Sequence, residues 1–124
     1  MNVVDSSGWL EYFADGPNAA TFSSPLCDTA SLIVPVVTIY EVYKVVLRER
    51  NENDALAAIS LMQKGGVVDC TAELAIAAAS LSLRFHLPMA DSLILATAQA
   101  HGATIWTQDA HFRAIPGVKY IEGR

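Results

Sequence analysis

The stretch LPMADSLILATAQAHGATIWTQDAHF, residues 87–112, constrains the fold more than any other part of the chain. Pro88 suits a helix start, and the unbroken apolar run after it predicts a buried helix. The short β-branched segment 103–107 then predicts a buried strand. Asp91 falls in the first turn of that helix, and Asp109 comes just after the strand. Because open parallel sheets bind ligands at the carboxyl ends of their strands, we expect Asp109 at such an edge.

Short apolar segments alternate with helical ones along the rest of the chain. This alternation predicts an α/β fold: a parallel sheet of about five strands, covered by helices on both faces. We expect a single domain over residues 1–124. The predicted strands are 2–4, 31–37, 67–70, 103–107 and 118–121. The predicted helices are one carrying the aromatic residues 9–13, a short one at 18–24 stopped by Pro25, and longer ones at 39–50, 54–64, 72–85 and 89–101.

Two helices carry additional sequence signals. The segment from Thr38 to Glu41 matches the capping box S/T-x-x-E, which predicts that Thr38 caps a helix starting at residue 39. The helix 72–85 is rich in alanine. Its small side chains predict close packing against the sheet.

The composition narrows the class of protein. The chain has 124 residues, is 52% hydrophobic and carries a net charge of −5. Such a hydrophobic content favours a compact domain over disorder. The negative charge argues against a protein held on nucleic acid by bulk charge alone. It is compatible with an enzyme whose acidic site holds cations, because bound metals neutralise carboxylates locally.

Several features bear on location and redox state. Pro35 and Glu41 interrupt the longest apolar stretch, so no membrane span is expected. The N-terminal MNVVDSS lacks the basic region of a signal peptide, which predicts a cytoplasmic protein. Cys27 and Cys70 are far apart, and we expect two free buried thiols. The last four residues, IEGR at 121–124, match a common protease recognition site and are either native or an addition.

Four carboxylates have positions that suggest a shared site: Asp5, Glu41, Asp91 and Asp109. Two follow predicted strands and two lie near helix starts, and these positions meet at one edge of a doubly wound sheet. Gathered carboxylates form a hard-oxygen site suited to Mg²⁺ or Mn²⁺. Each acid also has a purely local interpretation. Asp5 could be a helix cap and Glu41 half of a capping box, whereas Asp91 could complement the helix dipole and Asp109 could form an Asx turn.

Other polar residues have candidate supporting roles. Thr107 points to the same side as Asp109, so its hydroxyl could hold a carboxylate or a metal-bound water. Ser6 is a helix cap or a supporting residue beside Asp5. Lys44 and Arg48 lie on the same side of the predicted helix as Glu41. They are either ligands of substrate phosphates or part of a solvent-exposed helix face. His86, His101 and His111 share no ligand spacing, so zinc is not expected and His111 is interpreted as a packing or capping residue.

The segments VVDSSGWLEYF, VPVVTIYEV, LPMADSLILATA and TIWTQDAHF together resemble the PIN domain family, and within it the toxin ribonucleases of VapBC toxin–antitoxin pairs. The resemblance implies a three-layer α/β/α fold with a five-stranded parallel sheet and an acidic divalent-metal site. Asp5, Glu41, Asp91 and Asp109 match the four acids of that site, and Thr107 matches the hydroxyl residue of a T-x-D motif. It also implies a homodimer and a small VapB-like antitoxin whose C-terminal segment fills the site.

The sequence therefore predicts an endoribonuclease dependent on Mg²⁺ or Mn²⁺, acting as the toxin of a type II toxin–antitoxin system. RNA phosphodiesters would be hydrolysed by metal-activated water. Two alternatives remain open: a catalytically weak PIN-fold module that binds RNA or protein, and another metal-dependent phosphohydrolase such as a phosphatase. Cleavage of RNA, compared with a small phosphomonoester, separates the two enzymes.

Overall fold

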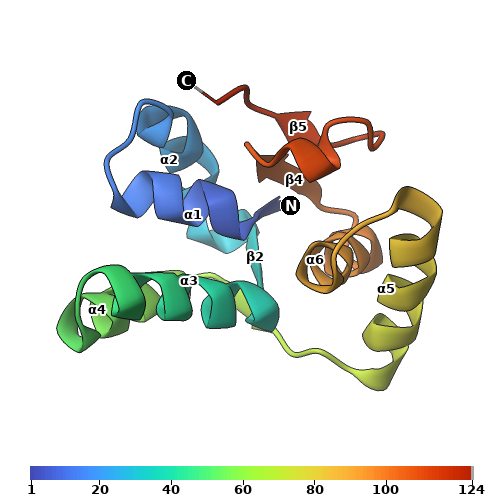
Figure 1. Ribbon diagram of the computed structural model, residues 1–124, viewed down its shortest axis with the longest axis horizontal. Helices are drawn as coiled ribbons and strands as arrows, with labels where there is room; N and C mark the ends of the chain where they lie inside the picture. The colour runs from blue at the N-terminus through green and yellow to red at the C-terminus, as the bar shows by residue number, and fades with distance from the viewer. Residues whose placement is uncertain (124) are drawn as a thin grey trace.

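The computed structural model describes residues 1–123. At its centre is a parallel five-stranded sheet with the strand order β3-β2-β1-β4-β5 (Figure 1). Arg124, the end of the 121–124 tetrapeptide, lies outside the described residues. The strands are β1 Asn2–Val4, β2 Leu32–Pro35, β3 Gly66–Val68, β4 Thr104–Thr107 and β5 Lys119–Tyr120. The helices are α1 Ser6–Phe13, α2 Ala19–Cys27, α3 Val36–Glu49, α4 Glu52–Met62, α5 Ala72–Phe85 and α6 Met89–Ala100, with 3₁₀ turns η1 Thr29–Ser31 and η2 Ala110–Phe112.

Helices cover both faces of the sheet, because neighbouring strand residues point to opposite sides and those on both sides are apolar. Val3 and Ile105 lie in one apolar cluster, which α5 and α6 complete. Val4 and Val34 lie in a second cluster, which includes side chains of α1 to α4. The predicted α/β fold with a central parallel sheet is confirmed.

The α6–β4 unit follows the sequence signals closely. Pro88 is the N-cap of α6, and Asp91 lies in its first turn. Gly102 has a φ of 60°, the left-handed conformation that ends the helix and turns the chain into β4. Asp91 and Asp109 are thereby placed at the two ends of one continuous unit.

The predicted capping box at Thr38 is wrong. Helix α3 begins at Val36, and Pro35 is its N-cap, with no capping hydrogen bond from a side chain. Thr38 is instead buried inside the first turn, where its hydroxyl donates to the Pro35 carbonyl at 2.6 Å. Because Glu41 is not part of a cap, its carboxylate is available to contacts outside α3.

Three other predictions need correction. Helix α2 continues through Pro25, which lies on the buried side of the helix with Phe22, so burial offsets the missing N–H. Helix α5 packs mainly against α6 rather than against the sheet, and α6 lies between α5 and β4 in Figure 1. Cys27 and Cys70 are free, as predicted, but both are exposed.

Within residues 1–123, no helix is both long enough and apolar enough to cross a bilayer.

Candidate active site

The carboxyl ends of β1 and β4 lie side by side and position two of the four acids. Val4 pairs with Trp106 in the parallel ladder, and the next residue, Asp5, donates its N–H to the Trp106 carbonyl at 3.1 Å. Asp109 follows the end of β4 by two residues. Asp91 comes from α6 and Glu41 from α3, so four separate elements supply the acids.

Asp5 is almost completely buried, with 1% of its surface exposed, and its carboxylate accepts three hydrogen bonds. One oxygen accepts from the Ser7 hydroxyl at 2.7 Å and from the Gly8 N–H at 3.0 Å. The other accepts from the Thr107 hydroxyl at 2.6 Å. Asp5 is thus the N-cap of α1 as well as a member of the acid group. The expectation that a Thr107 hydroxyl holds a carboxylate agrees with this geometry.

The same two hydroxyls tie Asp5 to the loop after β4. Ser7 accepts from the Gln108 N–H at 3.2 Å, and Thr107 accepts from the Asp109 N–H at 2.9 Å. Each hydroxyl therefore donates to Asp5 and accepts from the loop backbone. This arrangement fixes Asp5 and Asp109 relative to each other.

Gly8 permits the close packing that buries Asp5. A Cβ at this position would lie 2.5 Å from Val4 Cγ1 and 2.8 Å from the Phe22 ring. These distances are too short for any side chain. The DSSG sequence after β1 therefore combines the acid, a hydroxyl donor and a residue without a side chain.

Burial raises the pKa of the Asp5 carboxyl from 3.8 to about 6. The hydrogen bonds from Thr107, Ser7 and Gly8 act in the opposite direction, because they favour the charged form. The negative charge of Asp109 adds to the rise. The carboxylate is well supplied with donors and still costs free energy to ionise in the absence of a cation.

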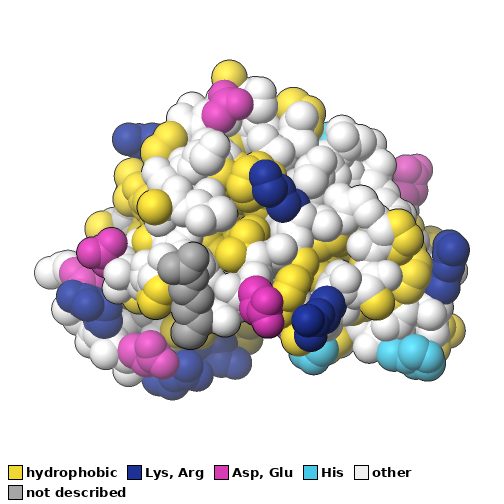
Figure 2. Space-filling view, turned by 90° about the horizontal axis from the view of Figure 1, so that it is seen from above, with side chains coloured by type: hydrophobic (Ala, Val, Ile, Leu, Met, Phe, Trp, Pro, Cys, Tyr) yellow, Lys and Arg dark blue, Asp and Glu magenta, His cyan; other side chains and the backbone are white. Residues whose placement is uncertain are grey.

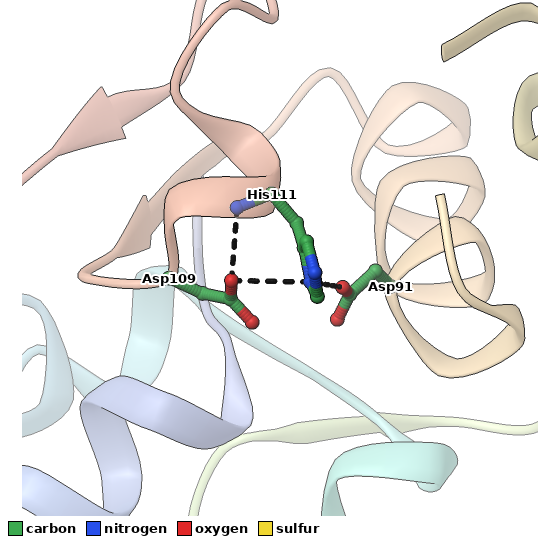
Figure 3. A group of neighbouring side chains, drawn as sticks. All are labelled: Asp91, Asp109 and His111. Atoms are coloured by element: carbon green, nitrogen blue, oxygen red, sulfur yellow. Dashed lines mark hydrogen bonds and ion pairs between the residues drawn. The ribbon is translucent and has the colours of Figure 1, made fainter. Parts of the chain in front are cut away.

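Asp91, Asp109 and His111 form the second part of the site (Figure 3). The His111 ring lies between the two carboxylates, with Nδ1 2.9 Å from an Asp91 oxygen and 3.2 Å from an Asp109 oxygen. Since ionised carboxylates only accept, Nδ1 must carry the hydrogen. The His111 backbone N–H also donates to Asp109 at 2.9 Å, so Asp109 caps η2.

The charges of this part shift two pKa values. Burial raises the pKa of Asp91, and the nearby charges of Asp109 and Glu41 raise it further, against the contact with His111. The hydrogen bond to Asp91 raises the pKa of His111, and the charge of Asp109 adds to this. The charge of Asp109 therefore contributes to both shifts, after burial for Asp91 and after the hydrogen bond for His111.

Glu41 joins the acid group through α1. Its carboxylate accepts from the Ser6 hydroxyl at 2.6 Å. Its charge is felt by Asp91. The structure thus brings all four predicted acids, with Ser6 and Thr107, to one edge of the sheet, while their roles in chemistry remain predictions.

Lys44 and Arg48 lie apart from these contacts. Lys44 is held 5.6 Å from the centre of the Tyr40 ring, and Arg48 pairs with Glu49 at 3.3 Å on the exposed side of α3. Their role as phosphate ligands stays an untested prediction. The solvated-face interpretation fits these contacts better.

Sequence reasoning missed His111 and Ser7. His111 was interpreted as a packing or capping residue, yet its ring contacts two of the acids. Its position two residues after Asp109 was the available signal. The role of Ser7 gave no signal in the sequence, because its contact with Thr107 joins residues 100 positions apart.

The residues present fit a divalent cation. Ligand atoms of Asp91, Asp109 and His111 lie within 4.8 Å of one another. Carboxylate oxygens are the preferred ligands of Mg²⁺ and Mn²⁺. Burial is the main cause of the raised pKa values of Asp5 and Asp91, and the charge of Asp109 adds to it, so a nearby cation would favour the charged form of both acids.

A family assignment follows from the sequence. The family model of the PIN domain matches residues 3–118, so the chain belongs to the PIN domain family. The resemblance stated from the four sequence segments is confirmed. No curated protein matches the chain.

Solved structures with the same fold include chains from toxin–antitoxin systems. The VapC20 toxin of Mycobacterium tuberculosis, described as cleaving the sarcin–ricin loop, is 18% identical with a TM-score of 0.81, covering 96% of this chain and 98% of that one. A toxin–antitoxin complex from Klebsiella pneumoniae gives 21% identity and a TM-score of 0.78, with 95% of each chain covered. VapBC2 of Rickettsia felis, bound to a promoter DNA fragment, gives 13% identity and a TM-score of 0.74, covering 98% of this chain and 97% of that one.

Proposed function

We propose that this protein is a Mg²⁺- or Mn²⁺-dependent endoribonuclease and the toxin of a type II toxin–antitoxin system. The observation that carries the proposal is the meeting of Asp5, Glu41, Asp91 and Asp109 at one sheet edge in a PIN domain. Solved structures of the same fold support the toxin role, since one is described as a toxin that cleaves the sarcin–ricin loop. The substrate is an RNA phosphodiester.

Asp5, Glu41, Asp91 and Asp109 would hold the cation. When bound, Mg²⁺ or Mn²⁺ supplies Lewis acidity, which polarises the phosphodiester, lowers the pKa of the attacking water and stabilises the leaving oxygen. The four acids would bind and orient the cation, and other residues of the chain hold these acids in place.

The hydroxyls position the acids. Thr107 and Ser7 fix the Asp5 carboxylate from two sides. Ser6 fixes one oxygen of Glu41. His111 holds Asp91 and Asp109 together by placing a donor between them. Such preorganisation avoids moving the ligands during the reaction.

An antitoxin of the VapB kind is the proposed protein partner. A groove of about 830 Å³ lies between α1 and the α3–α4 pair. Ser7, which donates to Asp5, lines it together with Glu11, Glu49 and the Arg50–Asp54 ion pair. A segment bearing Arg or Lys would complement this lining and the acids beyond it. Co-expression with the neighbouring small open reading frame should give a stable complex with low nuclease activity.

A homodimer is proposed through the uncovered side of α5. Ile76 and Leu83 are 73% and 82% exposed, and Met89, which follows α5 closely in the chain, is 76% exposed. Apolar side chains grouped in this way are typical of interaction surfaces. Light scattering should give the mass of two chains, and an Ile76→Glu, Leu83→Glu variant should give the mass of one.

The test of the nuclease is to incubate purified protein with RNA, with and without Mg²⁺, and to map the cut ends. We expect internal cuts that require the metal. Hydrolysis of a small phosphomonoester without RNA cleavage would indicate a phosphatase. Binding of RNA with neither activity would indicate a catalytically weak PIN-fold module.

A further inference from the structure

Four basic side chains lie over aromatic rings. This contact holds a cation in place without an acidic partner. The pairs are Lys44 with Tyr40, Arg84 with Phe85, Arg113 with Tyr120 and Lys119 with Trp106. Two of the pairs belong to the η2–β5 region, and Figure 2, viewed from that side, shows Lys or Arg side chains against hydrophobic surface.

Arg113 is anchored next to the acid group. It follows η2, the turn capped by Asp109, and its N–H donates to the Ala110 carbonyl at 3.1 Å. The residue before it, Phe112, is completely buried and fixes the turn to the core. The root of the Arg113 side chain is therefore only four residues from Asp109 in a rigid segment.

The Tyr120 ring, over which the Arg113 side chain lies, belongs to the same face of the sheet as Thr107. Tyr120 pairs with Thr107 in the parallel ladder, and paired residues of neighbouring strands share a face. Thr107 is the residue that donates to Asp5. The Arg113 guanidinium lies 5.6 Å from the centre of the Tyr120 ring.

The charge of Arg113 is free for a ligand. Within residues 1–123, the Lys and Arg ion pairs are Arg48 with Glu49 and Arg50 with Asp54. Arg113 forms none of them and is exposed. In a chain of net charge −5, an unpaired cation four residues after Asp109 offsets part of the repulsion that a polyanion meets on approaching the acid group.

We propose that Arg113, held over the Tyr120 ring, binds an RNA phosphate next to the bond that is cut, so that the single strand enters from the η2–β5 side. The proposal rests on the proposed ribonuclease function. A guanidinium can hold phosphate by two parallel hydrogen bonds and can stack on a base, which suits single-stranded RNA. Arg113 is thus a substrate-binding residue rather than a catalytic one.

Lys119 is a matched control on β5, the strand that also carries Tyr120. It too lies over a ring, 3.9 Å from the centre of that of Trp106, but neighbouring strand residues point to opposite faces. The Trp106 indole donates to Asn2 at 2.9 Å, which directs the ring toward the start of β1. Asp5 follows the end of β1, so Lys119 is directed away from the acids.

The experiment compares Arg113→Ala with Lys119→Ala in two assays. The first measures kcat and KM for cleavage of a fluorescein-labelled single-stranded RNA in Mg²⁺. The second measures binding of the same RNA by anisotropy across a salt series, in an Asp91→Asn background that is expected not to cut. For Arg113→Ala, we expect KM and Kd to rise roughly fivefold with kcat unchanged, and the slope of log K against log salt to fall by about 0.7.

The controls separate the possible outcomes. Lys119→Ala should change Kd less than about twofold, and Arg113→Lys should recover the salt slope but only part of the affinity. Equal effects of the two Ala variants would mean that only total charge matters and would overturn the proposal. Unchanged KM and Kd in Arg113→Ala with normal cleavage would overturn it while leaving the ribonuclease intact. RNA binding that depends on Arg113 without any cleavage by wild type would keep Arg113 as an RNA-binding residue but refute the nuclease, and with it the position next to a bond that is cut. Absence of both binding and cleavage would refute both proposals.

Discussion

The two halves of the acid group are built differently. Asp5 is buried and accepts three hydrogen bonds, all from residues that are part of α1 or β4. Asp91 and Asp109 are joined mainly by one side chain, His111, whose surface is 56% exposed. One half is fixed by the backbone around it, and the other is held by a residue that can rotate away into solvent.

This difference indicates separate tasks within one site. The Asp5 half has no freedom to adjust, because each of its donors is itself fixed by a backbone contact. The Asp91–Asp109 half already accommodates a donor between its carboxylates, the place where a cation would be attracted. We therefore expect changes in the first half to affect stability and changes in the second to affect metal response and cleavage.

The largest expected effect is on cleavage by Asp91→Asn. Removing one charged ligand should reduce cleavage by roughly a thousandfold or more, because a bound cation supplies several kcal/mol of charge stabilisation. The fold should survive, and the melting temperature in chelator should rise, since Asp91 no longer repels Asp109. The matched control is Glu73→Gln, which also removes an acid from the first turn of a helix. Near-normal cleavage by Asp91→Asn would exclude the site assignment, and equal loss in Glu73→Gln would indicate a helix-dipole effect.

The second prediction concerns Asp5 and pH. Its pKa is about 6 in the folded protein and 3.8 ordinarily, a difference that corresponds to about 3 kcal/mol. The folded state binds the proton more tightly, so this contribution is fully present below pH 3.8 and is lost as pH rises through about 6. In chelator, wild type should lose stability across that window, whereas Asp5→Asn should lose less. Parallel urea midpoints for the two proteins from pH 4 to 7.5 would contradict the assignment.

Asp5 lies at the edge of the sheet and is nevertheless almost completely buried, with 1% of its surface exposed. Asn at position 5 keeps an acceptor for Gly8 but presents an amide that cannot accept from Thr107 in the same way. The gain in stability of Asp5→Asn in chelator should therefore be smaller than that of Asp91→Asn. The two substitutions thus compare the halves directly.

A third prediction tests how the Asp5 half is fixed. Thr107→Val keeps the shape but removes the hydroxyl, leaving a buried carboxylate oxygen and the Asp109 N–H without that partner. We expect a loss of about 1–3 kcal/mol, with a fall in melting temperature of several degrees. Thr107→Ser should retain most of the stability. A Val variant as stable as wild type would mean that Thr107 contributes only packing.

The sequence predicted those features that depend on local spacing. The α6–β4 unit was recovered because Pro88 and Gly102 flank its helix, and the four acids were singled out because they follow strands or lie near helix starts. The start of α3 was missed because the match of Thr38 and Glu41 to a capping box is local, whereas Pro35 ends β2 and caps the helix. His111 and the burial of Asp5 were missed because both depend on contacts between distant segments.

The smallest expected effect is that of His111→Ala, and it tests whether the ring substitutes for a cation. The hydrogen bond to Asp91 raises the pKa of His111, so its stabilising effect is fully present below the ordinary pKa of 6.5 and is lost as pH rises through the folded value. Because the side chain is 56% exposed, the loss on substitution should be at most about 1 kcal/mol, seen in chelator below pH 6.5. In Asp91→Asn protein the same substitution should cost less, since the main partner is gone.

Metal separates the two possible roles of this ring. Mg²⁺ at 100 times its Kd should add roughly 2.7 kcal/mol to the free energy of unfolding of wild type. The increase should be at least as large in His111→Ala, because Mg²⁺ prefers oxygen ligands and would otherwise have to displace the imidazole ring. Asp91→Asn should show a reduced response. Thermal melts at pH 7.5 in chelator and in Mg²⁺ measure all three proteins. If the stabilisation by Mg²⁺ is reduced equally in His111→Ala and Asp91→Asn, the imidazole is a metal ligand. The Asp91–Asp109 half would then be fixed around the metal as firmly as the Asp5 half is fixed by its hydroxyl partners.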